Sequence, residues 1–333
     1  MKQNTNAYLP VVDFLKGYSI ATIVLFHLAQ KFYLSGILKY AINFGGAGVH
    51  VFVLCSGFGL YLSFLKKPIS FSFFLKKRFL KVYLPYIIIV FISYFIPNTY
   101  SGNDKFIALL SHIFLFKMFF EQYIGSFGPQ LWFISMILQF YITFGLIVSI
   151  FRRGSFVNNI ILSLLISLAW ATIVGFLGKS NLRVYNSFFL QYLWEFVLGM
   201  EIAKIYHKKG TIFIPPKWVL ALLIVFGVGM SGLFGVLGGW WKLYNDVPSL
   251  IGYGSLALLI YSLNMKWVNV FFIFTNKFSY EWYLIHMLLF YILFSFFNFY
   301  LSMWLIGLIA IVLSYMLAYC YHYILMKSVY KWV

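Results

Sequence analysis

Long apolar stretches follow one another along the whole chain, with few charges between them. Of the 333 residues, 63% are hydrophobic and only 10% are charged, whereas about a quarter of the residues of a soluble domain are charged. About 20 apolar residues suffice for a helix to cross a bilayer, and helices satisfy their own backbone hydrogen bonds in lipid. We therefore predict an all-α polytopic membrane protein with about ten transmembrane helices. The predicted spans are residues 9–30, 44–65, 79–97, 131–151, 158–178, 187–206, 217–239, 248–264, 278–298 and 300–325.

The segment 106–120 is apolar but short, and it contains His112 and Lys117. We predict an interfacial or re-entrant helix here; the alternative is an eleventh span. With ten spans and a cytoplasmic N-terminus, most of the 25 Lys and Arg residues fall in inner segments, as the positive-inside rule requires. An eleventh span would invert the second half of the chain. The basic residues therefore favour ten spans with both termini in the cytoplasm.

The net charge of +18 has a simple explanation in such a protein. Basic cytoplasmic loops contact membrane lipids, so no nucleic-acid partner is expected. The two cysteines, Cys55 and Cys320, both fall in apolar segments and imply no disulfide framework. The six histidines are scattered, so no metal is expected. An apolar surface can face lipid or a second copy, which leaves a homo-oligomer possible.

The first predicted span carries three ionisable residues, Asp13, Lys16 and His27. Such groups are costly inside a membrane and indicate function. Lys16 and His27 are eleven residues apart, close to three helical turns, so they share a face about 16 Å apart along the axis. Asp13 lies one turn from Lys16. A carboxylate and a cation toward one membrane surface, with an imidazole toward the other, suit chemistry that connects the two sides.

The densest basic run extends from Lys66 to Tyr86, on the predicted cytoplasmic side. Lys77, Arg78 and Lys81 have spacings that share a helix face. One interpretation is a topology signal with anionic-lipid contact. The other is a site for a cytosolic polyanion, such as the phosphates of a nucleotide-like cofactor.

Six short motifs occur in one order along the chain. They are Lys16 with His27 after ten residues, GVHVFVLCSGF from Gly48 to Phe58, RFLKVYLPY from Arg78 to Tyr86, Leu131-Trp132-Phe133, Phe196 with Gly199 and Met200, and Ser279 with Tyr283 and His286. In this order the chain resembles the integral-membrane acyltransferase 3 family, the bacterial O-acyltransferases that modify cell-surface glycans. Lys16 and Lys81 stand where the family has arginine, which keeps the charge but loses bidentate geometry.

This resemblance implies a bacterial cytoplasmic (inner) membrane enzyme. It would move an acetyl or other short acyl group from cytosolic acyl-CoA, most often acetyl-CoA, to a hydroxyl of a cell-surface glycan or its lipid-linked precursor. His27 would be the general base or a transient acyl carrier, with Lys16 and Asp13 completing the catalytic group. The donor would be bound by Lys77, Arg78, Lys81, Ser56 and Gly57.

Four further residues are candidates for binding the carbohydrate acceptor: His50, Trp132, Glu195 and His286. His50 could pair with His27 across a pocket or make a polar contact at the interface. Glu195 lies at depth in a span, where an acid is protonated, paired or functional. His286 could equally be a hydrogen-bonded structural residue.

Residues 1–333 are expected to form a single membrane acyltransferase domain, without the soluble esterase-like domain fused to some relatives. The alternative function is a multi-span transporter or exporter of a small molecule or glycan intermediate. Transporters often contain repeated halves with paired broken helices, and the two halves of this sequence show no convincing similarity.

Overall fold

The computed structural model describes residues 9–297 and 300–332. These residues form helices and connecting segments, with no β-strand among them, which confirms the all-α prediction. Eight helical segments within them are long and apolar enough to cross a membrane. They are Pro10–Ala29, Gly45–Lys66, Phe71–Phe95, Pro129–Phe151, Phe156–Phe176, Lys217–Leu237, Lys266–Phe297 and Met303–Ser328.

The two other predicted spans, 187–206 and 248–264, are shorter helices. They correspond to α11 (Leu193–Lys209) and α13 (Asp246–Ser262), which have 17 residues each and are therefore about 26 Å long. α11 packs against α3 (Gly48–Lys66) and α9 (Phe156–Phe176), and α13 packs against α12 (Lys217–Leu237) and α3. Both helices thus lie among the longer spans.

The predicted third span, 79–97, begins too late. The helix starts with α4 (Phe71–Arg78), passes through a π-helical turn (Phe79–Tyr83) and continues as α5 (Leu84–Phe95). Ser70 caps the start, because its hydroxyl accepts a hydrogen bond from the Phe73 N–H. Pro85 has no N–H to donate, and a π-helical turn absorbs such an interruption within a continuous helix. The predicted span 278–298 also starts too late in the sequence. In the structure, α14 (Lys266–Thr275) precedes α15 (Ser279–Phe297) in the same helical segment.

The segment 106–120 is not among the helices long enough to cross a membrane. It forms α6 (Lys105–Ile113) and a short 3₁₀ turn, followed by α7 (Glu121–Ile124), each too short to span. The fully buried Lys117 links this segment to the start of α8, because its ammonium donates to the carbonyls of Ile124 and Leu131 at 3.4 and 3.1 Å. The helix α2 (Gly36–Phe44) was not predicted.

Helix α3 lies at the centre of the bundle, between α1 (Pro10–Ala29) and α11. Two glycines bring α3 and α11 together. A Cβ on Gly57 would lie 2.0 Å from the Phe196 carbonyl oxygen, and one on Gly199 would lie 2.0 Å from the Leu54 carbonyl oxygen. Only glycine permits this close approach of two helix backbones.

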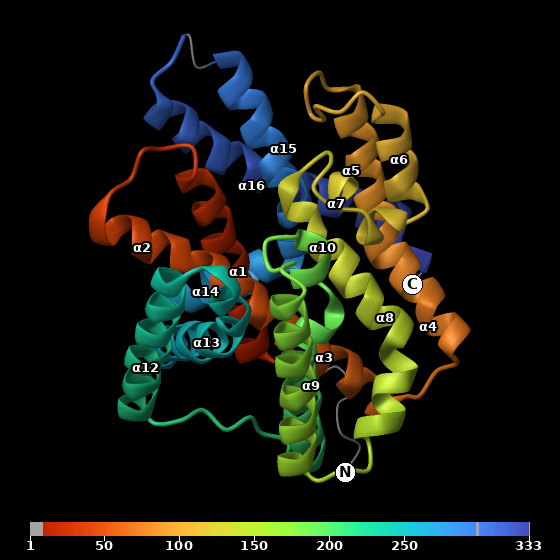
Figure 1. The fold of residues 1–333 in the computed structure, drawn as a ribbon, viewed down its shortest axis with the longest axis vertical. Helices are drawn as coiled ribbons and strands as arrows, with labels where there is room; N and C mark the ends of the chain where they lie inside the picture. Colours follow the sequence, from red (N-terminus) through yellow and green to blue (C-terminus); the bar gives the residue numbers. More distant parts are fainter. Residues whose placement is uncertain (1–8, 298–299, 333) are drawn as a thin grey trace.

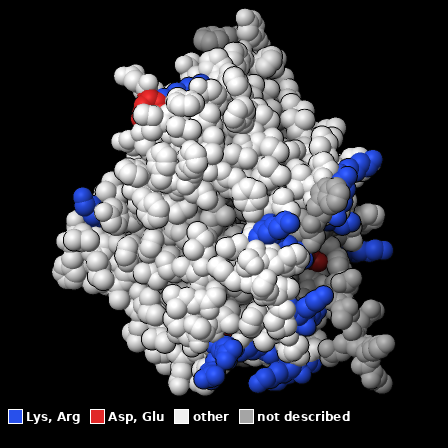
Figure 2. Space-filling model, turned by 90° about the vertical axis from the view of Figure 1, so that its right-hand side faces the viewer, with Lys and Arg blue, Asp and Glu red and all other residues white. Residues whose placement is uncertain are grey.

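Figure 1 shows how the remaining helices surround this pair. Helices α12, α13 and α14 lie beside α1 and α2 on one side, whereas α4, α5, α6 and α8 (Trp132–Phe151) lie on the other, and α15 and α16 (Met303–Ser328) cover the upper part. In Figure 2, Lys and Arg side chains gather toward the lower end of the molecule, while the broad surface above them is almost free of charge. This distribution agrees with a multi-pass membrane protein whose basic segments lie on one side.

Candidate active site

One cavity lies at the ends of α1, α3, α8 and α12 that are remote from the basic surface. Its volume is about 1100 Å³. His27 of α1, His50 of α3 and Trp132 of α8 line it together with Arg183 of α10 (Arg183–Asn186). The structure therefore places two predicted catalytic or acceptor-binding histidines and a predicted tryptophan around one space, which we call the outer cavity.

A chain of hydrogen bonds orients His27. The Nδ1 of His286 lies 3.0 Å from the carbonyl oxygen of Trp282, one turn earlier in α15, and its Nε2 lies 2.9 Å from Nδ1 of His27. The carbonyl can only accept, so His286 carries its proton on Nδ1 and accepts with Nε2. His27 must then donate from Nδ1, which leaves its Nε2 unprotonated. An imidazole in this tautomer can take a proton from a hydroxyl group.

The partner of His50 is Glu195. The Nδ1 of His50 lies 2.7 Å from the Glu195 carboxylate, and its Nε2 lies 3.8 Å from the Asp246 carboxylate. The suggested pairing of His50 with His27 is therefore not the one that the structure shows: Glu195 faces His50 across the α3–α11 contact, whereas His286 faces His27. Gln191 in turn donates to Asp246 at 2.6 Å.

Planar side chains form one wall of the outer cavity. The Arg183 guanidinium lies 5.0 Å from the Trp132 ring, Trp132 stacks on Tyr192 at 6.1 Å, and Tyr192 lies 5.7 Å from the His50 ring. We call these four residues the planar row. Aromatic faces of this kind suit the apolar face of a ring-shaped ligand.

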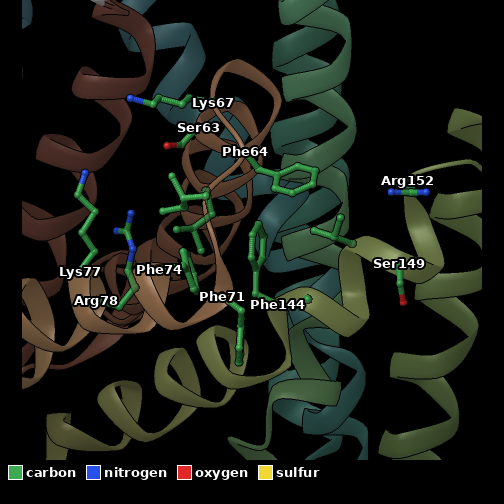
Figure 3. A pocket seen from close by; sticks show the side chains of 14 residues that line it. Ser63, Phe64, Lys67, Phe71, Phe74, Lys77, Arg78, Phe144, Ser149 and Arg152 are labelled. Atoms are coloured by element: carbon green, nitrogen blue, oxygen red, sulfur yellow. The ribbon is translucent and has the colours of Figure 1, made fainter.

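The second cavity, which we call the inner cavity, lies at the basic ends of α3, α4 and α8 and has a volume of about 350 Å³. Figure 3 shows Lys67, Lys77 and Arg78 on one side of it and Arg152 on the opposite side, with aromatic rings between. These rings are Phe64, Phe71, Phe74 and Phe144. Four cations around an aromatic lining suit a ligand that carries both phosphates and a flat ring.

Arg78 is partly enclosed by aromatic rings. Its guanidinium lies over the rings of Phe74 and Tyr141, and its buried Nε has no hydrogen-bond partner. Lys81, also predicted to bind the donor, lies in the π-helical turn and does not line the inner cavity.

The other predicted site residues line neither of these two cavities. Asp13 accepts a hydrogen bond from Asn276 at 2.8 Å, and Lys16 lies one turn further along α1. Ser56 donates to the Phe52 carbonyl of its own helix, and Gly57 forms the crossing with α11. Their roles in donor binding and catalysis stay predictions.

The two cavities share the helices α3 and α8 as walls. Along α8, Phe133 lines the outer cavity and Phe144 lines the inner one, a separation of about 16 Å at 1.5 Å per residue. Phe140 of α8 stacks on Phe196 of α11 at 4.4 Å between these two levels. A long, thin ligand group would have to pass this packed layer to connect the cavities.

Sequence reasoning missed four lining residues, namely Lys67, Arg152, Arg183 and Tyr192, and it also missed Asp246, which faces His50. Asp246 had a usable signal, since it is one of only seven acidic residues and lies at the start of a predicted span. Arg152 and Arg183 carried none, because single basic residues in loops are ordinary topology signals. Within the part of the chain that the structure describes, no group of three metal-ligating side chains comes together.

Comparison with curated proteins and with solved structures found no match. A family model described as an acyltransferase domain matches residues 9–323, nearly the whole chain. The chain therefore belongs to the integral-membrane acyltransferase 3 family and is a membrane acyltransferase.

Proposed function

We propose that this protein transfers an acyl group, in the first instance acetyl, from cytosolic acyl-CoA to a hydroxyl of a cell-surface glycan or its lipid-linked precursor. The observation that carries this proposal is the hydrogen-bond chain from the Trp282 carbonyl through His286 to Nδ1 of His27 at the outer cavity, because it leaves Nε2 of His27 to accept a proton. The protein would lie in the bacterial cytoplasmic membrane, with both termini and the basic end in the cytoplasm, in agreement with the positive-inside rule.

The inner cavity would bind the donor from the cytoplasmic side. Lys67, Lys77, Arg78 and Arg152 would contact the phosphates of the CoA group, and the phenylalanine rings between them would pack against its adenine. The slender pantetheine arm of CoA would then extend between α3 and α8 toward His27. The packed layer at Phe140 and Phe196 would have to move for the arm to pass.

The reaction in the outer cavity would begin when Nε2 of His27 takes the proton of the acceptor hydroxyl. The hydroxyl oxygen attacks the thioester carbonyl carbon, the C–S bond breaks, and the CoA thiolate leaves. The proton on His27 then passes to the thiolate, which restores the imidazole. If His27 instead carried the acyl group, an acylated protein would form in the absence of acceptor.

The test uses the full chain purified in detergent and then reconstituted in vesicles, with radiolabelled acetyl-CoA. Arg152 and its neighbour Arg153 are both exposed, but only Arg152 lines the inner cavity. We expect CoA to raise the unfolding temperature of the wild type and of Arg153→Gln, and to raise that of Arg152→Gln much less. His27→Gln should keep the CoA response but lose acetyl transfer. Transfer by His27→Gln at the wild-type rate, or equal CoA responses in both arginine variants, would contradict the proposal.

A further inference from the structure

Two side-chain oxygens of residues that line the outer cavity have no hydrogen-bond partner among the described residues. The side-chain oxygen Oε1 of Gln130 is buried, accepts no hydrogen bond and belongs to a residue that is only 4% exposed. The Oδ1 of Asn245 is buried and unpartnered as well, and both residues line the cavity. A buried acceptor without a donor costs free energy. Because both residues line the cavity, a small turn of either side chain would let its oxygen accept from a ligand that carries hydroxyl groups.

The guanidinium of Arg183 is available in the same space. Within residues 9–297 and 300–332 it forms no ion pair or side-chain hydrogen bond, and its contact is with the face of Trp132. The backbone beneath it is fixed, because the carboxylate of Glu121 accepts from the N–H groups of Arg183 and Val184 at 2.8 and 2.9 Å. Arg183 is therefore held at the cavity wall with its donors free.

The nearby carboxylates do not occupy Arg183. Glu195 and Asp246 are both directed at His50, with the shorter distance at 2.7 Å. Among the described residues Arg183 forms no ion pair with either carboxylate, although it lies near enough to Asp246 to act on it electrostatically, and its exposed side chain lines the cavity. The planar fork of a guanidinium matches the two oxygens of a carboxylate or phosphate.

We propose that the acceptor is an anionic glycan whose carboxylate or phosphate group is bound by Arg183. A sugar ring of this glycan lies against Trp132 and Tyr192 of the planar row, and its hydroxyls donate to Gln130 and Asn245. This inference rests on the proposed function, because it names the class of acceptor for the same cavity.

The experiment measures binding of three probes to the full chain in detergent, without acyl donor. The probes are an oligosaccharide of glucuronic acid, a glucose oligosaccharide of equal length, and the same glucose oligosaccharide carrying one phosphate. The proteins are the wild type, Arg183→Gln, Arg183→Lys and the control Lys242→Gln. Lys242 is an exposed cation near the same end of α12 that does not line the cavity, so it reports general charge attraction.

We expect the wild type to bind at least one charged probe more tightly than the neutral one, and the probe that does so identifies carboxylate or phosphate. Arg183→Gln should weaken that binding about ten-fold or more and leave the neutral probe unaffected. Arg183→Lys should recover part of the loss, and Lys242→Gln should change nothing. Equal affinity for all probes in the wild type, or equal loss for charged and neutral probes in Arg183→Gln, would overturn the inference.

Transfer assays on the same proteins separate this inference from the proposed function. If acetyl transfer from acetyl-CoA depends on His27 but charged and neutral probes bind alike, the acceptor class is wrong and the acyltransferase mechanism stands. If the charged probes bind through Arg183 but no acyl group is ever transferred from CoA, the donor assignment is wrong and the anionic-glycan site stands.

Discussion

The Nδ1 atom of His27 lies 2.9 Å from the Nε2 atom of His286, and the carbonyl of Trp282 fixes the proton of His286 on its other nitrogen. Two helices that are far apart in the sequence thus set the tautomer of one imidazole. His286 does not line the outer cavity, so it acts on the reaction through His27 and is a positioning residue.

The first prediction concerns this positioning. His286→Leu removes the acceptor of the His27 proton, so the imidazole can rotate and exchange tautomers. We expect kcat for acyl transfer to fall about 10²-fold or more, with little change in KM for acetyl-CoA. The control is the exposed residue His207 near the end of α11, where His207→Leu should leave both constants unchanged. A rise in the donor KM at constant kcat would instead assign His286 to donor binding.

The second prediction concerns the π-helical turn that carries Lys81. The Tyr280 hydroxyl of α15 donates to the Val82 carbonyl at 2.6 Å, and further tyrosines reach the carbonyls of Lys81 and Pro85. This turn directly follows Arg78. Tyr280→Phe should therefore leave the cations that bind the acyl donor less firmly positioned. We expect KM for acetyl-CoA to rise several-fold, roughly the effect of one lost hydrogen bond.

A matched control for this prediction lies on the same helix. The Tyr291 hydroxyl donates to the Pro97 carbonyl at 3.0 Å, a bond of the same type far from the inner cavity. Tyr291→Phe should leave the donor KM unchanged. If both variants change KM equally, the effect comes from general loosening of α15 and not from the π-helical turn.

The third prediction concerns the crossing of α3 and α11. In Gly199→Ala the added methyl group would lie 2.0 Å from the Leu54 carbonyl oxygen, which forces the two backbones apart. We expect a loss of stability above the about 1–3 kcal/mol of ordinary overpacking, measured as a fall in the unfolding temperature in detergent. In Gly59→Ala the methyl group meets no atom within 4 Å, so stability should stay equal or rise slightly. Equal unfolding temperatures would mean that the helices cross less closely than described.

The fourth prediction concerns the pH dependence of stability. Burial lowers the pKa of the Lys117 ammonium from its usual 10.5 to about 7. Between these values the unfolded chain holds a proton that the folded chain has lost, so the free energy of unfolding rises with pH in that window. We expect the unfolding temperature of the wild type to rise between about pH 7 and pH 9 relative to Lys117→Met, which lacks the titrating group.

The measurement uses thermal unfolding of both proteins across that pH range. Lys242→Met, at an exposed cation, corrects for the pH response of surface charge. A constant difference between wild type and Lys117→Met at every pH would show that Lys117 acts only through its hydrogen bonds to Ile124 and Leu131.

Much of the fold followed from the sequence because lipid imposes a simple rule: apolar stretches of about 20 residues become helices. The segment 106–120 was predicted not to span for the same reason, and its helices are indeed too short to do so. The start of the third span was wrong, since residues 71–78 end in three consecutive cations and their helix depends on the Ser70 cap and on contacts with α8. The helix α2 was not predicted at all.

By itself the sequence determined the helical membrane fold and the family, and it indicated His27, His50, Trp132 and the basic run before Tyr86 as candidate site residues. Each of these signals is local, since it depends on apolar length, on helical spacing or on a motif a few residues long. Only the tertiary structure decided which partners meet. The pairing of His27 with His286, of His50 with Glu195, and of Arg183 with Trp132 joins residues from different helices. Such contacts depend on how the helices cross, and one sequence does not encode that in any local pattern.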